Sequence, residues 1–273
     1  MKKNMKYVFL IILLLIFYGI FLFMETRFQD NGKIPVITVP DSTLITSVST
    51  NEGELLKEVS ALDIEDGNIT SSVYIESISA FDENQTRTIT YAVLDSDDNI
   101  ARATRKMQYS DYSSPEITIT NALCMYYLES TDSLKDYVQA TSCVDGDISS
   151  QISVDKADFK GDDFDVTYSV TDSCGVKTTL TTNVTILSST NDIHITLSEY
   201  MIKVKKGQKI KPKDYIENIE IMSMNEMDLI DEVKVSQNYD PSKEGTYEFI
   251  YRIEENGEIG VTKLVVVVEG DEG

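Results

Sequence analysis

The chain repeats one stretch three times, as TRTITYAVLDSDDN (residues 86–99), DFDVTYSVTDSCG (residues 163–175) and TYEFIYRIEENGE (residues 246–258). In each copy a tyrosine is followed four residues later by an acidic residue. The residues before the acid alternate between β-branched or aromatic types and small or polar types, which is typical of a half-buried strand. Self-similarity at a fixed spacing indicates repeated structural units, so this stretch predicts the architecture of the whole chain.

Each copy lies late in a unit that opens with another β-rich run. These runs are PVITV, PEITIT and IHITL, and they recur about every 80 residues. The joints between units, YSDYSSPE and LSSTND, are short and polar, as expected for domain linkers. We therefore predict three domains, at residues 34–111, 115–188 and 192–269.

The pattern within each unit is that of a β-sandwich. After the acidic turn, the runs ARATRKMQY, VKTTLTTNVTIL and GVTKLVVVV are typical of the hairpin partner of the tyrosine strand. Short strands separated by turn signals every 8–12 residues or so indicate an antiparallel sandwich. The predicted fold class is therefore all-β, with three tandem sandwiches that follow one another end to end as a stalk.

The beginning of the chain differs from the rest, because residues 7–24 contain no charged residue. Eighteen residues at 1.5 Å each give a helix of about 27 Å, close to the roughly 30 Å core of a bilayer. We therefore expect a transmembrane anchor here. Lys2, Lys3 and Lys6 precede it, so the positive-inside bias predicts a cytoplasmic tail at residues 1–6 and extracellular domains in a single-pass cell-membrane protein. The alternative is a cleaved secretory signal, although FLFMETRF lacks the small residues of a cleavage site.

The composition is strongly acidic, with 24 Lys and Arg residues against 46 Asp and Glu residues and a net charge of −22. Such a surface repels nucleic acid and anionic lipid headgroups. It suits an exported surface or one that takes up divalent cations, and simple solubility is the alternative. The three cysteines, Cys124, Cys143 and Cys174, all lie in the middle unit, and their odd number leaves one thiol over if a disulfide forms.

The first two units share a further motif, ALDIEDGNITSSV (residues 61–73) and ATSCVDGDISSQI (residues 140–152). Together with the tyrosine strand and its acidic turn, this motif resembles the bacterial immunoglobulin-like domains. That family occurs in tandem on Gram-positive surface proteins and beside some insecticidal crystal toxins, and is distantly similar to hyalin repeats. The resemblance covers nearly all of residues 34–269 and implies an immunoglobulin-like fold without specifying a function. The third unit has MNEMDLIDEVKV in place of the Asp-Gly motif.

In an immunoglobulin-like sandwich the Asp-Gly loop and the acidic turn lie at the same end. The resemblance therefore implies a disulfide between Cys143 and Cys174, one in each loop, with Cys124 left over; a buried free thiol is the alternative. It also implies a gathering of carboxylates that could bind calcium, which takes about six to eight oxygen ligands. The candidate ligands are Asp63, Asp66, Asp95, Asp98, Asp111, Asp145, Asp147 and Asp172. The alternative is that these residues form and cap ordinary turns.

Catalytic signatures are missing from the sequence. The one histidine, His194, lies in a predicted strand without a nucleophile and base around it, and neither zinc spacing nor a phosphate-binding glycine loop is found. We therefore expect no enzyme activity and no cofactor other than possible calcium. The predicted function is a membrane-anchored extracellular stalk, adhesion or protein-interaction module. Its expected partners are the membrane and another surface or envelope protein or cell-wall glycan, but not nucleic acid. The alternative function is a calcium-dependent or ligand-sensing accessory subunit of a cell-envelope complex.

Overall fold

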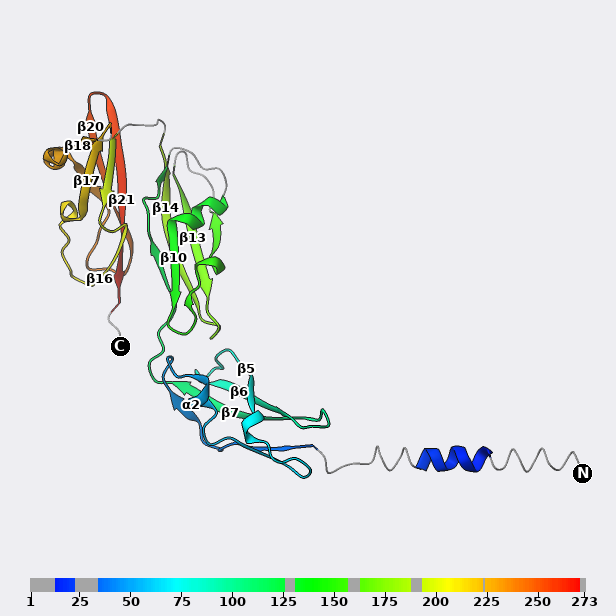
Figure 1. Ribbon diagram of the computed structural model, residues 1–273. Helices are drawn as coiled ribbons and strands as arrows, with labels where there is room; N and C mark the ends of the chain where they lie inside the picture. Colours follow the sequence, from blue (N-terminus) through cyan, green and yellow to red (C-terminus); the bar gives the residue numbers. More distant parts are fainter. Residues whose placement is uncertain are drawn as a thin grey trace, which may run out of the picture. The chain divides into compact units, whose positions relative to one another are not determined.

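The computed structural model describes residues 13–22, 34–125, 131–156, 163–187, 193–222 and 224–270. These residues form three β-sandwiches, each built from a three-stranded and a four-stranded sheet (Figure 1). The chain divides into two compact units, residues 1–110 with the first sandwich and residues 111–273 with the other two. The predicted all-β class with three tandem immunoglobulin-like sandwiches is confirmed, while the limits predicted for each domain stay predictions.

The first sandwich packs its two sheets around one hydrophobic core. Its elements are β1 Val36–Thr38, β2 Leu44–Thr46, α2 Glu52–Leu55, β3 Ser60–Asp63, β4 Gly67–Asn68, the 3-10 helix η1 Thr70–Ser72, β5 Tyr74–Ile78, β6 Arg87–Leu94 and β7 Ile100–Tyr109. One sheet has the order β1-β3-β4 and the other the order β2-β7-β6-β5. In β6 the residues at alternate positions point into the core, as the period-two pattern predicts.

The second sandwich repeats this plan. Its elements are β8 Glu116–Ile119, β9 Cys124–Met125, η2 Thr131–Tyr137, β10 Val138–Ser142, β11 Gly146–Asp147, η3 Ser149–Gln151, β12 Ser153–Lys156, β13 Asp163–Thr171 and β14 Lys177–Ile186. The sheet orders are β11-β10-β8 and β12-β13-β14-β9. In both sandwiches the Asp-Gly motif forms a tight hairpin. The φ angle is +73° at Gly67 and +72° at Gly146, in the left-handed region that glycine adopts most easily.

The third sandwich keeps the plan although its Asp-Gly motif is missing. Its elements are β15 Ile193–Leu197, β16 Met201–Lys205, η4 Pro212–Tyr215, β17 Ile216–Ile221, β18 Met224–Asn225, η5 Met227–Glu232, β19 Lys234–Gln237, β20 Gly245–Glu255 and β21 Glu258–Glu269. The sheet orders are β15-β17-β18 and β16-β21-β20-β19. The β17–β18 hairpin therefore stands where the other sandwiches have their Asp-Gly hairpin.

One strand in each sandwich departs from the predicted antiparallel pairing. β2 pairs in parallel with β7, β9 with β14, and β16 with β21. The reason is topological, because the chain crosses from the first sheet to the second and then runs beside the last strand in the same direction. These short pairings cover only part of the last strand, so the rest of its edge needs another partner.

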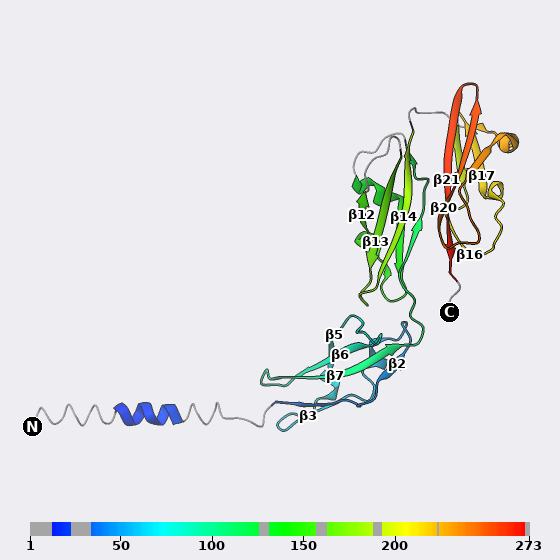
Figure 2. The same ribbon diagram turned by 180° about the vertical axis from the view of Figure 1, so that it is seen from behind.

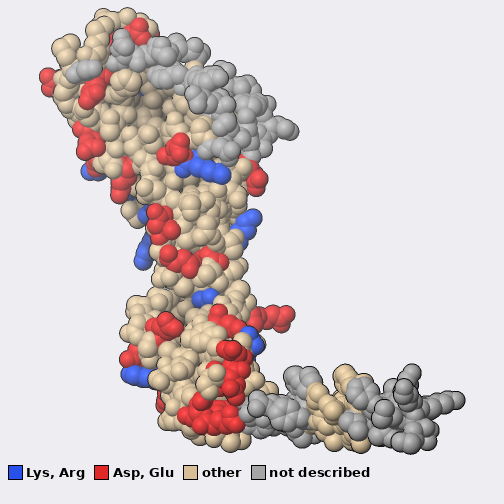
Figure 3. Space-filling view, turned by 45° about the vertical axis from the view of Figure 1, so that its right-hand side comes forward, with Lys and Arg blue, Asp and Glu red and all other residues tan. Residues whose placement is uncertain are grey.

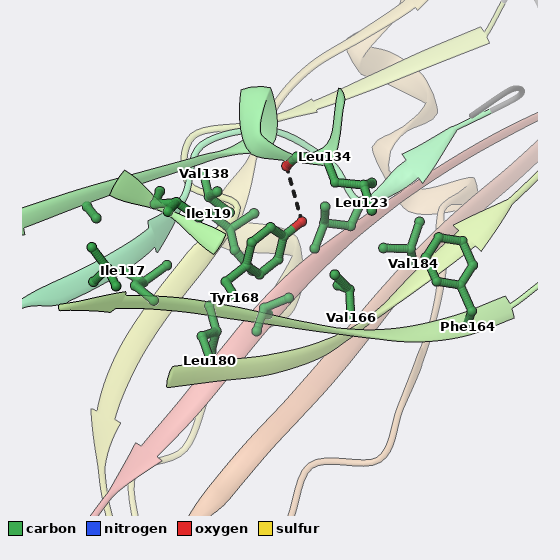
Figure 4. Packing of buried hydrophobic residues seen from close by; sticks show 14 of the residues in the cluster. Ile117, Ile119, Leu123, Leu134, Val138, Phe164, Val166, Tyr168, Leu180 and Val184 are labelled. Carbon is green, nitrogen blue, oxygen red and sulfur yellow. Dashed lines mark hydrogen bonds between the residues drawn. The ribbon is translucent and has the colours of Figure 1, made fainter. Parts of the chain in front are cut away.

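The repeated tyrosine has the same role in all three sandwiches. Tyr91, Tyr168 and Tyr251 are each fully buried. Their hydroxyl groups donate hydrogen bonds to backbone carbonyls of short helical segments across the core, at 2.9 Å to Leu55, 3.3 Å to Leu134 and 2.8 Å to Pro212. Figure 4 shows the second of these bonds among the packed side chains of its core. The tyrosine thus fills the core and ties a helical segment to the opposite sheet.

The predicted transmembrane anchor at residues 7–24, and with it the single-pass membrane localisation, is not supported by the structure. The helix described there covers residues 13–22. Among the described residues, no helix is both long enough and apolar enough to cross a membrane. The predicted cytoplasmic tail at residues 1–6 lies outside the described residues.

The second and third sandwiches lie side by side within the second unit, as Figures 1 and 2 both show. Val265 of β21 belongs to the third sandwich, yet its side chain is buried in the hydrophobic core of the second. Val267 and Met201 pack against the same core. The expected end-to-end order is therefore wrong for these two sandwiches, because the open edge of the second is covered by a sheet face of the third.

Candidate functional site: the loop ends and the seam of the second unit

The Asp-Gly loop and the acidic turn meet at one end of the first and second sandwiches, as predicted. In the first, Asp66 of the loop accepts 2.8 Å hydrogen bonds from the backbone N–H and the hydroxyl of Ser96 in the turn. In the second, Asp145 accepts a 2.8 Å bond from the backbone N–H of Ser173. The equivalent aspartate therefore joins the two loops in both sandwiches.

The other carboxylates at these ends serve their own turns. Asp63 Oδ1 accepts bonds from two backbone N–H groups of its loop at 2.7 and 2.8 Å, and Asp95 Oδ1 does the same in its turn at 2.9 and 2.8 Å. Asp172 Oδ1 accepts a 3.0 Å bond from a backbone N–H of the acidic turn. Asp147 accepts a 2.6 Å bond from the Ser149 hydroxyl, which lowers the pKa of the Asp147 carboxyl. These are the bonds of turn-capping aspartates.

The predicted calcium ligands are not brought together as a coordination set. Within the described residues there is no group of three or more His, Cys, Asp or Glu side chains that could hold a metal ion. The Oδ1 atoms of Asp63, Asp95 and Asp172 instead accept backbone N–H groups of their own loops. Asp98 is exposed with a φ of +64°, and Asp111 lies at the start of the second unit. Asp63 Oδ2 is buried without a hydrogen-bond partner, and calcium binding stays a prediction.

The predicted Cys143–Cys174 disulfide is not formed in the structure. All three cysteines are described, and all three are thiols. The Cys143 thiol donates a 3.1 Å hydrogen bond to the backbone carbonyl of Ser113 and accepts a 3.4 Å bond from the N–H of the same residue. Cys174 is buried in the acidic turn. Burial also raises the pKa of Cys124, in β9, to about 11.

Two side chains hold the start of the second unit against the loop end of the second sandwich. The Tyr112 hydroxyl donates a 2.6 Å hydrogen bond to Asp172 Oδ2. Burial and this bond raise the pKa of Tyr112 far above its ordinary value. Cys143 binds the next residue, Ser113, through both of its backbone groups. The loops that the sequence predicted as a calcium site therefore bind Tyr112 and Ser113, which precede the first strand of the second sandwich.

The most deeply buried charged residue among those that the structure describes, Lys263, lies in the contact between the second and third sandwiches, which we call the seam. We define the seam by Thr182 and Asn183 of β14, Glu248 of β20, and Lys263 and Val265 of β21. The Lys263 side chain is 1 % exposed and that of Glu248 is 16 % exposed, and their charged atoms lie 3.5 Å apart. A buried ion pair is stable only when further hydrogen bonds satisfy its remaining atoms.

Those further bonds go to the edge of β14, beyond its short pairing with β9. Lys263 Nζ donates a 2.7 Å bond to the backbone carbonyl of Asn183. Glu248 Oε1 accepts bonds at 3.2 Å from the backbone N–H of Asn183 and from the hydroxyl of Thr182. The ion pair thus satisfies both backbone groups of one edge residue. An edge strand left with open backbone groups is a site for aggregation, and here the neighbouring sandwich covers it.

Sequence reasoning missed the seam. The signal that could have revealed it lies in the apolar run VTKLVVVV (residues 261–268). Lys263, Val265 and Val267 share the face of this strand that would point to solvent in an isolated sandwich, yet two of these three residues are apolar. A strand with apolar residues on both faces indicates burial on both faces. A lysine buried on such a face needs a carboxylate and further hydrogen-bond partners, because an unpaired buried charge is unfavourable.

The comparisons with known proteins support no family assignment. The chain matches no known family model and no curated protein. Among solved structures, it resembles the CBM51-2 and INT domains of Clostridium perfringens ZmpB, with 28 % identity over 32 % of this chain and 22 % of that one, at a TM-score of 0.22. The M60 catalytic domain with CBM51-1 and CBM51-2 of the same protein matches at 11 % identity over 88 % of this chain and 31 % of that one, with a TM-score of 0.24.

A further similar structure is that of human CDH23 EC21-23, at 12 % identity over 86 % of this chain and 100 % of that one, with a TM-score of 0.21. The chain spans between about a fifth and a third of the Clostridium chains compared above. All of these TM-scores are low, so the fold assignment rests on the sheets and cores described above. What those proteins bind is therefore no guide to this chain.

Proposed function

We propose that the chain is a non-enzymatic interaction module, in which the second and third sandwiches act as one rigid body that presents a fixed surface to a partner protein. The single observation that supports this proposal is the buried Lys263–Glu248 pair bonded to Asn183. Sandwiches that served only as independent spacers would need no charged contact of this kind. A preorganised surface lowers the entropy lost when a partner binds.

The charge of the molecule favours a neutral or basic partner. The net charge is −22, and Figure 3 shows Asp and Glu side chains more often than Lys and Arg over the visible face. At the loop end of the first sandwich, Glu65, Asp66, Asp97 and Asp98 are all exposed. Such a surface attracts positive groups on another protein and repels nucleic acid.

The test uses the full chain with a photo-crosslinking residue at the exposed position Lys209 of the third sandwich. A captured protein is purified, and its affinity is measured for the wild type, for Lys263→Met and for Lys203→Met. We expect weaker binding only for Lys263→Met, because Lys203 pairs with Glu116 at the partly exposed rim. Equal affinity for all three forms would contradict a role for the rigid body, and turnover of a substrate by the purified chain would contradict a non-enzymatic function.

A further inference from the structure

A cavity of about 360 Å³ lies beside the seam, between the second and third sandwiches. Asn121 and Cys124 line it from the second sandwich, and His194, Tyr200, Glu220 and Thr262 line it from the third. Its volume is at the lower end of the range typical of ligand pockets, roughly 300–1,000 Å³. The cavity therefore has room for a molecule with one ring rather than for a chain of them.

Thr262 is the group in this cavity that most needs a partner. It is 1 % exposed, and its hydroxyl is buried without a hydrogen-bond partner. Thr262 lies opposite Tyr251, and the equivalent positions opposite Tyr91 and Tyr168 hold Ala103 and Leu180. The third sandwich thus has a hydroxyl where the others have an apolar side chain. A buried hydroxyl without a partner is unfavourable, and because Thr262 lines the cavity, a ligand that reaches this hydroxyl would relieve that cost.

The other walls offer hydrogen-bonding groups and one carboxylate, that of Glu220. His194 and Glu220 are cross-strand partners on β15 and β17, and Glu220 accepts a 2.7 Å bond from Asn218. Cys124 stays a neutral thiol near pH 7, because burial raises its pKa to about 11. The Glu220 carboxylate repels anions. The Lys263 ammonium next to the cavity is already engaged by Glu248 and Asn183, so it gives an anion no compensating charge.

We propose that this cavity binds an uncharged molecule with several hydroxyl groups and the size of one sugar ring. Such a ligand supplies both donors and acceptors, as the imidazole, carboxylate, amide and threonine hydroxyl of the lining require. It would also bridge the two sandwiches beside the seam, and so hold them together more firmly. This inference does not depend on the proposed function, because a spacer without any protein partner could still carry the site.

The test is binding of glucose and N-acetylglucosamine to the full chain, measured by saturation-transfer NMR and calorimetry. Glucuronate serves as the matched anionic probe. We expect millimolar or tighter binding of at least one neutral sugar and clearly weaker binding of glucuronate. Failure of both neutral sugars to bind would overturn the proposal, leaving a cavity filled only with water. Glucuronate binding as tight as that of glucose would overturn the assignment to uncharged ligands.

Two variants separate the site from general stability. Thr262→Val keeps the shape of the side chain but removes the hydroxyl, so we expect about tenfold weaker sugar binding together with a higher melting temperature of the unliganded protein. His194 is exposed, so His194→Ala leaves the fold intact and should also weaken binding. Thr90→Val in the first sandwich is the control and should bind like the wild type. Unchanged sugar affinity in both cavity variants would overturn the proposal.

Discussion

Lys263 and Glu248 form a buried ion pair that also satisfies the two backbone groups of Asn183 on a different sandwich. The pair lies on the outer face of the third sandwich, next to Val265, which is buried in the core of the second. Charged and apolar contacts therefore stabilise the same seam. Each can be tested by substitution.

Replacing Lys263 with methionine should destabilise the second unit strongly. The change removes the counter-charge of the Glu248 carboxylate and the donor of the Asn183 carbonyl, and breaking a buried pair from one side costs about 3–5 kcal/mol. Urea unfolding of the full chain measures the effect. Lys203→Met is the matched control, since Lys203 is 34 % exposed and its ion pair with Glu116 should be worth about 0–1 kcal/mol. Similar losses for the two variants would contradict the special role of the seam.

Stability should fall steeply above about pH 10, the ordinary pKa of tyrosine. Burial is the main cause that raises the pKa of Tyr91, Tyr112, Tyr168 and Tyr251 in the folded protein. Their unfolded forms lose protons first, so the stability that these groups contribute is complete below pH 10 and is lost as the pH rises toward their folded values. Urea midpoints at pH 8 and pH 11 check this. A midpoint that does not change would contradict the burial of these hydroxyls.

The hydroxyl of the repeated tyrosine should contribute a similar amount in each sandwich. Replacing Tyr91, Tyr168 or Tyr251 with phenylalanine keeps the ring in the core but removes the hydrogen bond to the helical segment. We expect a loss of about 1 kcal/mol in each case, from the lost bond and the carbonyl left without its donor. Thermal melting of the three variants measures it. Variants as stable as the wild type would show that these bonds do not contribute.

A melting experiment decides between the predicted calcium site and the turn-capping alternative, in which the candidate carboxylates serve only their own loops and calcium should leave the melting temperature unchanged. Any ligand that binds only the native state must raise the midpoint. Melting with and without millimolar calcium is the measurement. Asp63→Ser is the informative variant, since Ser142 occupies the same position in the second sandwich and accepts the same loop N–H bonds. A rise in the wild type that disappears in Asp63→Ser would contradict this expectation and locate a site at Asp63.

The three thiols should react at different rates. Cys143 is exposed and should be alkylated quickly in the native protein, whereas Cys174 is buried. Cys124 should react slowly, because its pKa of about 11 leaves little thiolate at pH 8. Mass spectrometry of the alkylated chain, without prior reduction, gives the rates. A linked Cys143–Cys174 peptide would instead restore the disulfide that the resemblance implied.

The strands and loop ends were largely predictable because they depend on local patterns. The alternation around Tyr91 and Tyr168 marks the core-facing side of each strand, and the Asp-Gly motif specifies its turn through the positive φ of Gly67 and Gly146. The cysteine pairing was not predictable in this way. Two cysteines in neighbouring loops do not have to bond to each other, because each thiol can instead form hydrogen bonds with nearby backbone groups. Cys143 does so with the backbone of Ser113.

The sequence by itself determined that this protein is a series of three β-sandwiches with acidic loop ends, because period-two burial and turn-forming residues act over a few positions. Only the tertiary structure decided which partners the isolated polar groups would find. Lys263 and Asn183 are 80 positions apart in the sequence and 2.7 Å apart in space, a contact that no local pattern encodes. The seam and its neighbouring cavity exist because burying the open edge of one sandwich under a face of another satisfies both apolar and charged groups at once.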